Sequence, residues 1–170
     1  MRAAYITELG PAEAIRAGEL PVPAAGPTDV LVRVEVVVVD PVDTMVRSGA
    51  YRTPTPFPFV VGRDLVGTVA AAGAGVAGFV AGDRVWCNSL GHGGRQGSFA
   101  EYAVVPAERL YHLPAGVDPV EAVAVLHPAA TAYLALFRHG GLRPSEILYV
   151  AGAAGNVGTV MTRLARAGGA

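Results

Sequence analysis

The fold of this 170-residue sequence is decided by Glu146-Ile-Leu-Tyr-Val150 and by Gly152-Ala-Ala-Gly-Asn-Val-Gly158, which follows it. The first run is short and apolar, as is typical of a buried strand. The second favours a tight turn, because glycine adopts positive φ without steric cost. Apolar residues then return at helical spacing, at Val157, Val160, Met161 and Leu164. The stretch therefore predicts a strand, a glycine turn and a helix.

The glycine turn suits a ligand that carries a pyrophosphate. It reads Ala153-x-Gly155-x-x-Gly158, the dinucleotide-binding pattern with alanine in its first glycine slot. Small residues let the backbone approach the phosphates, Gly158 would let the helix lie close to its strand, and the free N–H groups of the helix start favour an anion. An ordinary tight turn is the alternative. The residue that selects NAD or NADP normally lies about 20 positions further on, beyond Ala170.

The chain before this stretch has a β pattern followed by a helical one. Valine-rich and alternating runs separated by Gly, Pro and Asp predict strands over 30–39, 65–72, 84–87 and 99–105. Many short strands of this kind favour a small barrel or sandwich. From Asp118 to His139, helical spacing interrupted at Pro128 predicts two short helices.

Composition excludes several classes of function. The 13 basic residues, all arginine, balance 14 acidic ones, so no field favours nucleic acid, and no lysine can act as a base or form a Schiff base. The single cysteine, Cys87, cannot form an internal disulfide, and we expect it to be buried and inert. No apolar run reaches the roughly 20 residues of a membrane helix, and the amino terminus lacks a signal core. We expect a cytoplasmic protein without membrane or nucleic-acid partners.

Six stretches in order resemble one family: 40–51, 62–69, 82–86, 97–102, 128–133 and the glycine turn. They resemble the zinc-independent quinone oxidoreductase (zeta-crystallin-like) branch of the medium-chain dehydrogenase/reductase superfamily. The resemblance implies a mixed α+β and α/β chain: a GroES-like β-barrel domain over 1–115, a helical junction over 116–145, and over 146–170 the first strand, turn and helix of an incomplete Rossmann domain. It also implies a homodimer that binds NADPH between the domains and passes hydride to a quinone or an α,β-unsaturated carbonyl.

The resemblance assigns roles to individual residues. Tyr51 matches a tyrosine beside the nicotinamide and the substrate, and Thr131 matches a threonine near the cofactor. The pyrophosphate turn corresponds to Ala154, Gly155, Asn156, Val157 and Gly158. Asp40 occupies a slot that is often asparagine, so it could hold the acceptor oxygen only as a neutral acid, which a water-poor cleft would favour.

Structural alternatives stand beside these roles. Asp40 could simply cap the turn before Pro41, and Tyr51 could be a loop aromatic that closes the barrel. Asp43 and Arg47, four residues apart on a short predicted helix, favour a surface ion pair.

A metal is not expected. Relatives of this family that depend on zinc carry a cysteine near the position of Asp40 and Gly-His-Glu where this chain has Gly62-Arg63-Asp64. The four histidines of this chain lack the spacing of metal ligands. The sequence thus predicts the N-terminal part of an NADPH-dependent reductase, inactive or weakly active as 170 residues alone. The alternatives are an enoyl reductase acting on a thioester and a non-catalytic binding or assembly module.

Overall fold

The computed structural model describes residues 1–170 and divides the chain into two compact units, Met1–Val123 and Ala124–Ala170. Each unit has its own buried residues and is described separately. The finer division of the chain at residues 115 and 145 stays a prediction.

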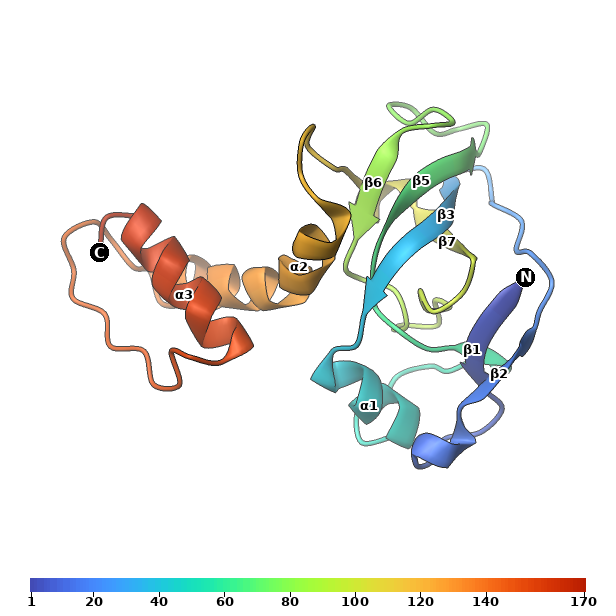
Figure 1. Cartoon of the computed structure of the whole chain (residues 1–170), viewed down its shortest axis with the longest axis horizontal. Coiled ribbons are helices and arrows are strands. Elements are labelled where there is room, and N and C mark those ends of the chain that lie inside the picture. Colours follow the sequence, from blue (N-terminus) through green and yellow to red (C-terminus); the bar gives the residue numbers. More distant parts are fainter. The chain divides into compact units, whose positions relative to one another are not determined.

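Two antiparallel sheets form most of the N-terminal unit (Figure 1). The smaller sheet has the order β2-β1-β4, built from Arg16–Glu19, Arg2–Ile6 and Phe59–Val60. The larger has the order β7-β3-β5-β6-β8, built from Tyr102–Pro106, Asp29–Val38, Asp64–Ala72, Arg84–Cys87 and Tyr111–His112. Two single turns of 3₁₀ helix, Ala12–Ala14 and Ala107–Arg109, lie between β1 and β2 and between β7 and β8 along the chain.

The predicted strands β3, β5 and β6 are confirmed to within one residue. β7 begins at Tyr102 rather than Phe99. The reason is that the preceding residues bond elsewhere: the Phe99 carbonyl accepts from the Ala4 N–H at 2.8 Å, and Ala100 forms a bridge with Ala3. These contacts tie the two sheets together.

Alternating side chains of these strands fill the core of the N-terminal unit. Val30 and Val32, two residues apart on β3, are fully buried because successive side chains of a strand point to opposite faces. The cluster is completed by side chains of β5, β6 and β7 and the loops beside them, including Leu65, Val69, Val85, Cys87, Leu90, Ala103, Val105 and Leu110. A second cluster, Ile6, Val46, Phe59 and Val61, lies between α1 and the small sheet.

The helix α1, Pro41–Ser48, connects the two sheets. It begins at Pro41, whose missing N–H has no partner to lose in the first turn. It ends at Gly49, which has φ of 80°. Its boundaries place Asp40 at the N-cap position of the helix and Tyr51 in the loop after it.

The prediction of two short helices after Asp118 is wrong. α2, Pro119–Tyr133, contains Pro128 in its interior and continues as a π-helical segment, Leu134–His139. Within these 21 residues an 18-residue window reaches a mean hydropathy of 1.5, so one helix is long and apolar enough to cross a membrane, contrary to the expectation from uninterrupted apolar runs. Length and composition alone are weak evidence of a span, because core helices of soluble proteins meet the same criteria.

The C-terminal unit confirms the predicted helix but lacks the predicted strand. α3 covers Asn156–Ala167. The segment 146–150 belongs to neither sheet, and Ile147 and Tyr149 are 100% and 89% exposed. A strand needs a partner for its backbone N–H and C=O groups, and none pairs with this segment.

Candidate active site

The glycine turn presents an open backbone at the start of α3. Residues 151–156 are exposed, and Gly155 occupies the position before the helix, where its N–H donates to the Gly152 carbonyl at 3.0 Å. Gly158 is buried, and a Cβ there would lie 2.2 Å from the Gly152 carbonyl oxygen. The absence of a side chain at 158 therefore lets the turn fold back onto the helix.

The donor set of this turn fits a pyrophosphate. No bulky side chain stands at Ala153, Ala154 or Gly155, and Val157 is only partly exposed. The first N–H groups of a helix have no partner within the helix, so they are available to phosphate oxygens. Thr131, the other residue predicted to lie near the cofactor, has an exposed side chain on α2.

The second candidate feature is the Tyr51 side chain, which belongs to the N-terminal unit. Tyr51 is 40% exposed, and its hydroxyl lies 3.2 Å from His92 Nε2. The Arg63 guanidinium carbon lies 6.0 Å from the centre of the Tyr51 ring. A phenol beside a cation and an imidazole can donate a hydrogen bond and hold a transient negative charge.

His92 and Arg63 were not predicted as site residues. Residues 91–94 lie between the predicted strands over 84–87 and 99–105, and Gly62-Arg63-Asp64 was predicted only as a family motif. Tyr51 and His92 are 41 positions apart. No periodicity in the sequence could bring them together, whereas the loop glycines beside His92 were a usable signal of a close backbone approach.

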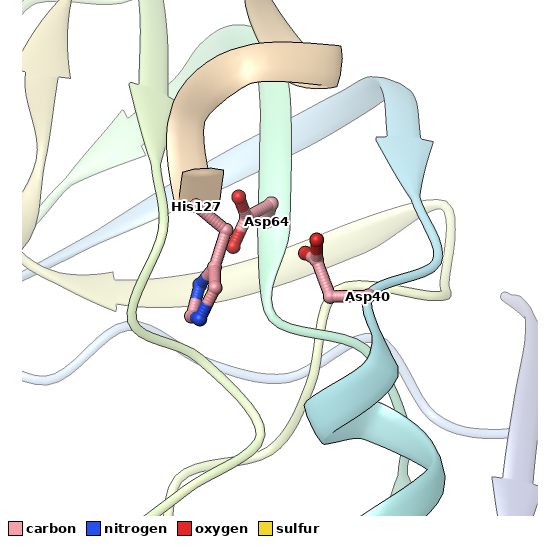
Figure 2. Close-up of side chains that lie close together, drawn as sticks. All are labelled: Asp40, Asp64 and His127. Atoms are coloured by element: carbon pink, nitrogen blue, oxygen red, sulfur yellow. The ribbon is translucent and has the colours of Figure 1, made fainter. Parts of the chain in front are cut away.

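Asp40, Asp43 and Asp64 form an acidic cluster in the same unit. Figure 2 shows the Asp40 carboxylate at the entry to α1 and the Asp64 carboxylate on β5. Oxygens of these two carboxylates lie within 4.8 Å of one another. All three residues are less than 9% exposed.

The interpretation of Asp43 and Arg47 as a surface ion pair is wrong. Asp43 Oδ2 instead accepts from the Asp40 N–H at 2.8 Å, and Arg47 Nε donates to the Gly10 carbonyl at 3.2 Å. Burial raises the pKa of Asp43 from 3.8 to about 6, and the charges of Asp40 and Asp64 act in the same direction, while the Asp40 N–H and Arg63 oppose it. Asp43 therefore holds a proton under mildly acidic conditions.

Cys87 is fully buried in the core, as predicted. Burial also raises the pKa of its thiol, so little thiolate forms near neutral pH. The structure gives this cysteine no feature of a nucleophile.

Comparison with known proteins places these features in a family. The family of the alcohol dehydrogenase GroES-like domain matches residues 26–115. The chain belongs to this family. A quinone oxidoreductase of Lama guanicoe is 36% identical over 168 residues, which cover 98% of this chain and 50% of that protein. A quinone oxidoreductase of Pseudomonas syringae pv. tomato superposes on 99% of the chain and 50% of its own, with a TM-score of 0.89 and 30% identity.

These relatives assign this GroES-like chain to the quinone oxidoreductase branch of the medium-chain dehydrogenase/reductase superfamily, and confirm the mixed fold. A mycobacterial protein solved in complex with NADPH has 32% identity and a TM-score of 0.87, covering 99% of this chain and 51% of its own. The chain spans about half the length of the curated relatives it matches. It is thus related to oxidoreductases through a part of their length.

Proposed function

We propose that this chain belongs to an NADPH-dependent, zinc-independent oxidoreductase that reduces a quinone or an α,β-unsaturated carbonyl. The observation that carries the proposal is the open glycine turn at the start of α3. Gly158 packs so closely there that an added Cβ would lie 2.2 Å from the Gly152 carbonyl oxygen. Relatives named quinone oxidoreductases and a neighbour solved with NADPH support the same chemistry.

In this proposal each unit contributes its own part. The backbone from Ala154 to Gly158 binds the pyrophosphate, and Thr131 contacts the cofactor. NADPH supplies the hydride when bound. Tyr51 donates its hydroxyl hydrogen to the acceptor oxygen, and Asp40 is a second donor if it is protonated.

The direct test is an NADPH-oxidation assay of the complete protein encoded by this reading frame against a panel of quinones, enones and enoyl thioesters. We expect turnover with at least one acceptor and a loss of at least about tenfold in kcat/KM for Tyr51→Phe, which removes the donated hydrogen bond. No NADPH oxidation with any acceptor would contradict the proposal. Activity confined to enoyl thioesters would select the enoyl reductase alternative.

Zinc independence rests on Arg63, which stands where zinc-dependent relatives carry histidine, because a guanidinium is not a zinc ligand. Activity should therefore survive dialysis against a chelator. Elemental analysis should find less than about one zinc per ten chains, an occupancy too low to account for full turnover.

A second candidate is a non-catalytic binding or assembly module. It is favoured by the exposed apolar side chains of Ile147 and Tyr149, in a segment that pairs with neither sheet. We also propose a homodimer for the reductase, so oligomeric state alone does not separate the two. Light scattering combined with the NADPH assay does: a dimer without turnover supports the module, and a dimer with turnover supports the reductase.

A further inference from the structure

The loop that carries His92 is built into the fold by its backbone. A Cβ at Gly91 would lie 2.5 Å from the Gly62 carbonyl oxygen, so only glycine allows the loop to pack this closely against the residue before Arg63. Gly91 also has φ of 59°, a conformation that side chains rarely adopt. The position of His92 is therefore set by chain geometry.

The same loop is fastened to the loop that carries Tyr51. The Gly93 N–H donates to Thr53 Oγ1 at 2.7 Å, and the Gly94 N–H donates to the Pro54 carbonyl at 3.1 Å. The contact between Tyr51 and His92, with ring centroids 5.5 Å apart, is thus supported by two hydrogen bonds that involve neither ring. An incidental contact between two exposed side chains would lack such support.

The Tyr51 hydroxyl carries a single hydrogen, and this limits the direction of its hydrogen bond with His92. If Tyr51 donated that hydrogen to His92, it would have none left for an acceptor oxygen. If His92 is protonated at Nε2, the imidazole donates to Tyr51 Oη, and the phenol hydrogen stays available. The 3.2 Å contact serves the proposed reaction only with the second arrangement.

We propose that His92 is a positioning residue that donates its Nε2–H to Tyr51 Oη and returns a proton to Tyr51 during reduction. This inference rests on the proposed function. Hydride adds with its electron pair to the acceptor carbon, and the negative charge moves to the acceptor oxygen. The Tyr51 O–H bond breaks as that oxygen takes the proton. The His92 Nε2–H bond breaks as the phenolate is reprotonated, and Nδ1 takes a proton from a solvent water, whose hydroxide is neutralised by the buffer. Exchange with solvent then returns the imidazole to the Nε2-protonated tautomer.

The surrounding charges favour this direction of proton flow. The groups that face His92 are Tyr51, Arg63, Arg95 and Arg109. Partial burial and the three arginines lower the pKa of His92, so the imidazole is neutral near physiological pH and carries one N–H. Arg63 places a positive charge 6.0 Å from the centre of the Tyr51 ring. A positive environment thus disfavours an imidazolium and tolerates the anion that the relay needs.

Kinetics of the complete protein test the relay. His92→Ala should lower kcat by about tenfold, which is less than the loss expected for removal of a direct general acid. KM should change little, and added imidazole should restore part of the lost kcat. His92→Gln keeps an N–H donor but cannot relay a proton, so we expect an intermediate kcat. In a Tyr51→Phe background, His92→Ala should cost nothing further. His139→Gln, at an exposed histidine in the C-terminal unit, is the matched control.

Wild-type kcat in both His92 variants would overturn the inference, and so would full additivity with Tyr51→Phe. Thermal unfolding of each variant separates loss of the relay from loss of the fold, and His92→Gln replaces His92→Ala if the latter does not fold.

Nitrogen-15 NMR of His92 tests the hydrogen bond without any turnover. We expect the Nε2-protonated tautomer at neutral pH and a shift of its resonance in Tyr51→Phe. The Nδ1-protonated tautomer would overturn the inference, even in an active enzyme. Absence of NADPH oxidation in the wild type would instead refute the proposed function, and the NMR result would still decide the hydrogen bond.

Discussion

The N-terminal unit buries its apolar strand residues, whereas the C-terminal unit leaves comparable residues in solvent. Phe59 on β4 is fully buried, but Ile147, in a run with the composition of a strand, is fully exposed. Every strand of the N-terminal unit has a partner in its own sheet, and the segment 146–150 has none. Strand propensity thus becomes a strand only where a partner satisfies the backbone and covers the side chains.

The largest expected effect contrasts these two residues directly. Phe59→Ala should destabilise the chain by about 3–5 kcal/mol, since it opens a cavity in a packed cluster. Ile147→Ala should change the free energy of unfolding by less than about 0.5 kcal/mol, as surface substitutions do. Urea denaturation followed by circular dichroism measures both. Equal losses for the two variants would show that segment 146–150 is packed in solution.

A second effect concerns the acidic cluster of the N-terminal unit. Because the pKa of Asp43 is raised from 3.8 to about 6, the folded state holds this proton more tightly than the unfolded state. Its contribution to stability is full below pH 4 and is lost as the pH rises to about 6, by up to roughly 3 kcal/mol. Denaturation at a series of pH values measures this fall.

Asp43→Asn isolates that contribution. The amide oxygen can still accept from the Asp40 N–H, but the side chain no longer ionises. The fall in stability between pH 4 and 6 should become smaller. Asp83→Asn, at a partly exposed aspartate that accepts from the Val80 N–H, is the matched control. An unchanged pH dependence in Asp43→Asn would mean that Asp43 titrates normally.

A smaller effect is expected where α2 begins, just before the point at which the chain divides into its two units. Asp118 Oδ1 accepts from the N–H groups of Val120 and Glu121 at 2.9 and 3.0 Å. Asp118→Ala should cost about 1 kcal/mol, while Asp118→Asn should retain most of the stability. Helical circular dichroism during thermal unfolding measures both variants, and equal melting temperatures for alanine and asparagine would contradict the capping role.

The smallest effect concerns the fastening of the His92 loop. Thr53→Val removes the acceptor for the Gly93 N–H, and we expect a loss of about 0.5–1 kcal/mol because the exposed N–H can turn to water. Thr53→Ser keeps the hydroxyl and is the control. Hydrogen exchange of the Gly93 amide should accelerate in Thr53→Val only, and equal protection in both variants would show that the loop is held in another way.

The local pattern predicted much of the fold. The valine alternation of β3 and the spacing of α3 specify their elements, because burial of one face is sufficient to do so. The two-residue strands β4 and β8 have no such pattern, since their pairing partners define them. Pro128 misled because a helix can pass through proline when neighbouring contacts hold it.

The sequence could predict individual residues of the candidate site but not the contacts between them. The glycine turn is local in sequence, and its geometry follows from residues 152–158. The contact of Tyr51 with His92 and Arg63 comes from loops on different strands, so spacing along the chain carries no information about it. Asp43 was misjudged for the same reason, because the charges that act on it include those of Arg63 and of Asp64 on β5.

The most direct test of the account is NADPH binding by the complete protein, followed by nicotinamide fluorescence, with a charge added in the glycine turn. Ala154→Glu should weaken binding at least about tenfold, or about 1.4 kcal/mol, because a carboxylate there repels the diphosphate. Ala167→Glu, which places the same charge at the other end of α3, should bind NADPH like the wild type. Equal affinity in all three proteins would contradict the claim that this turn holds the cofactor.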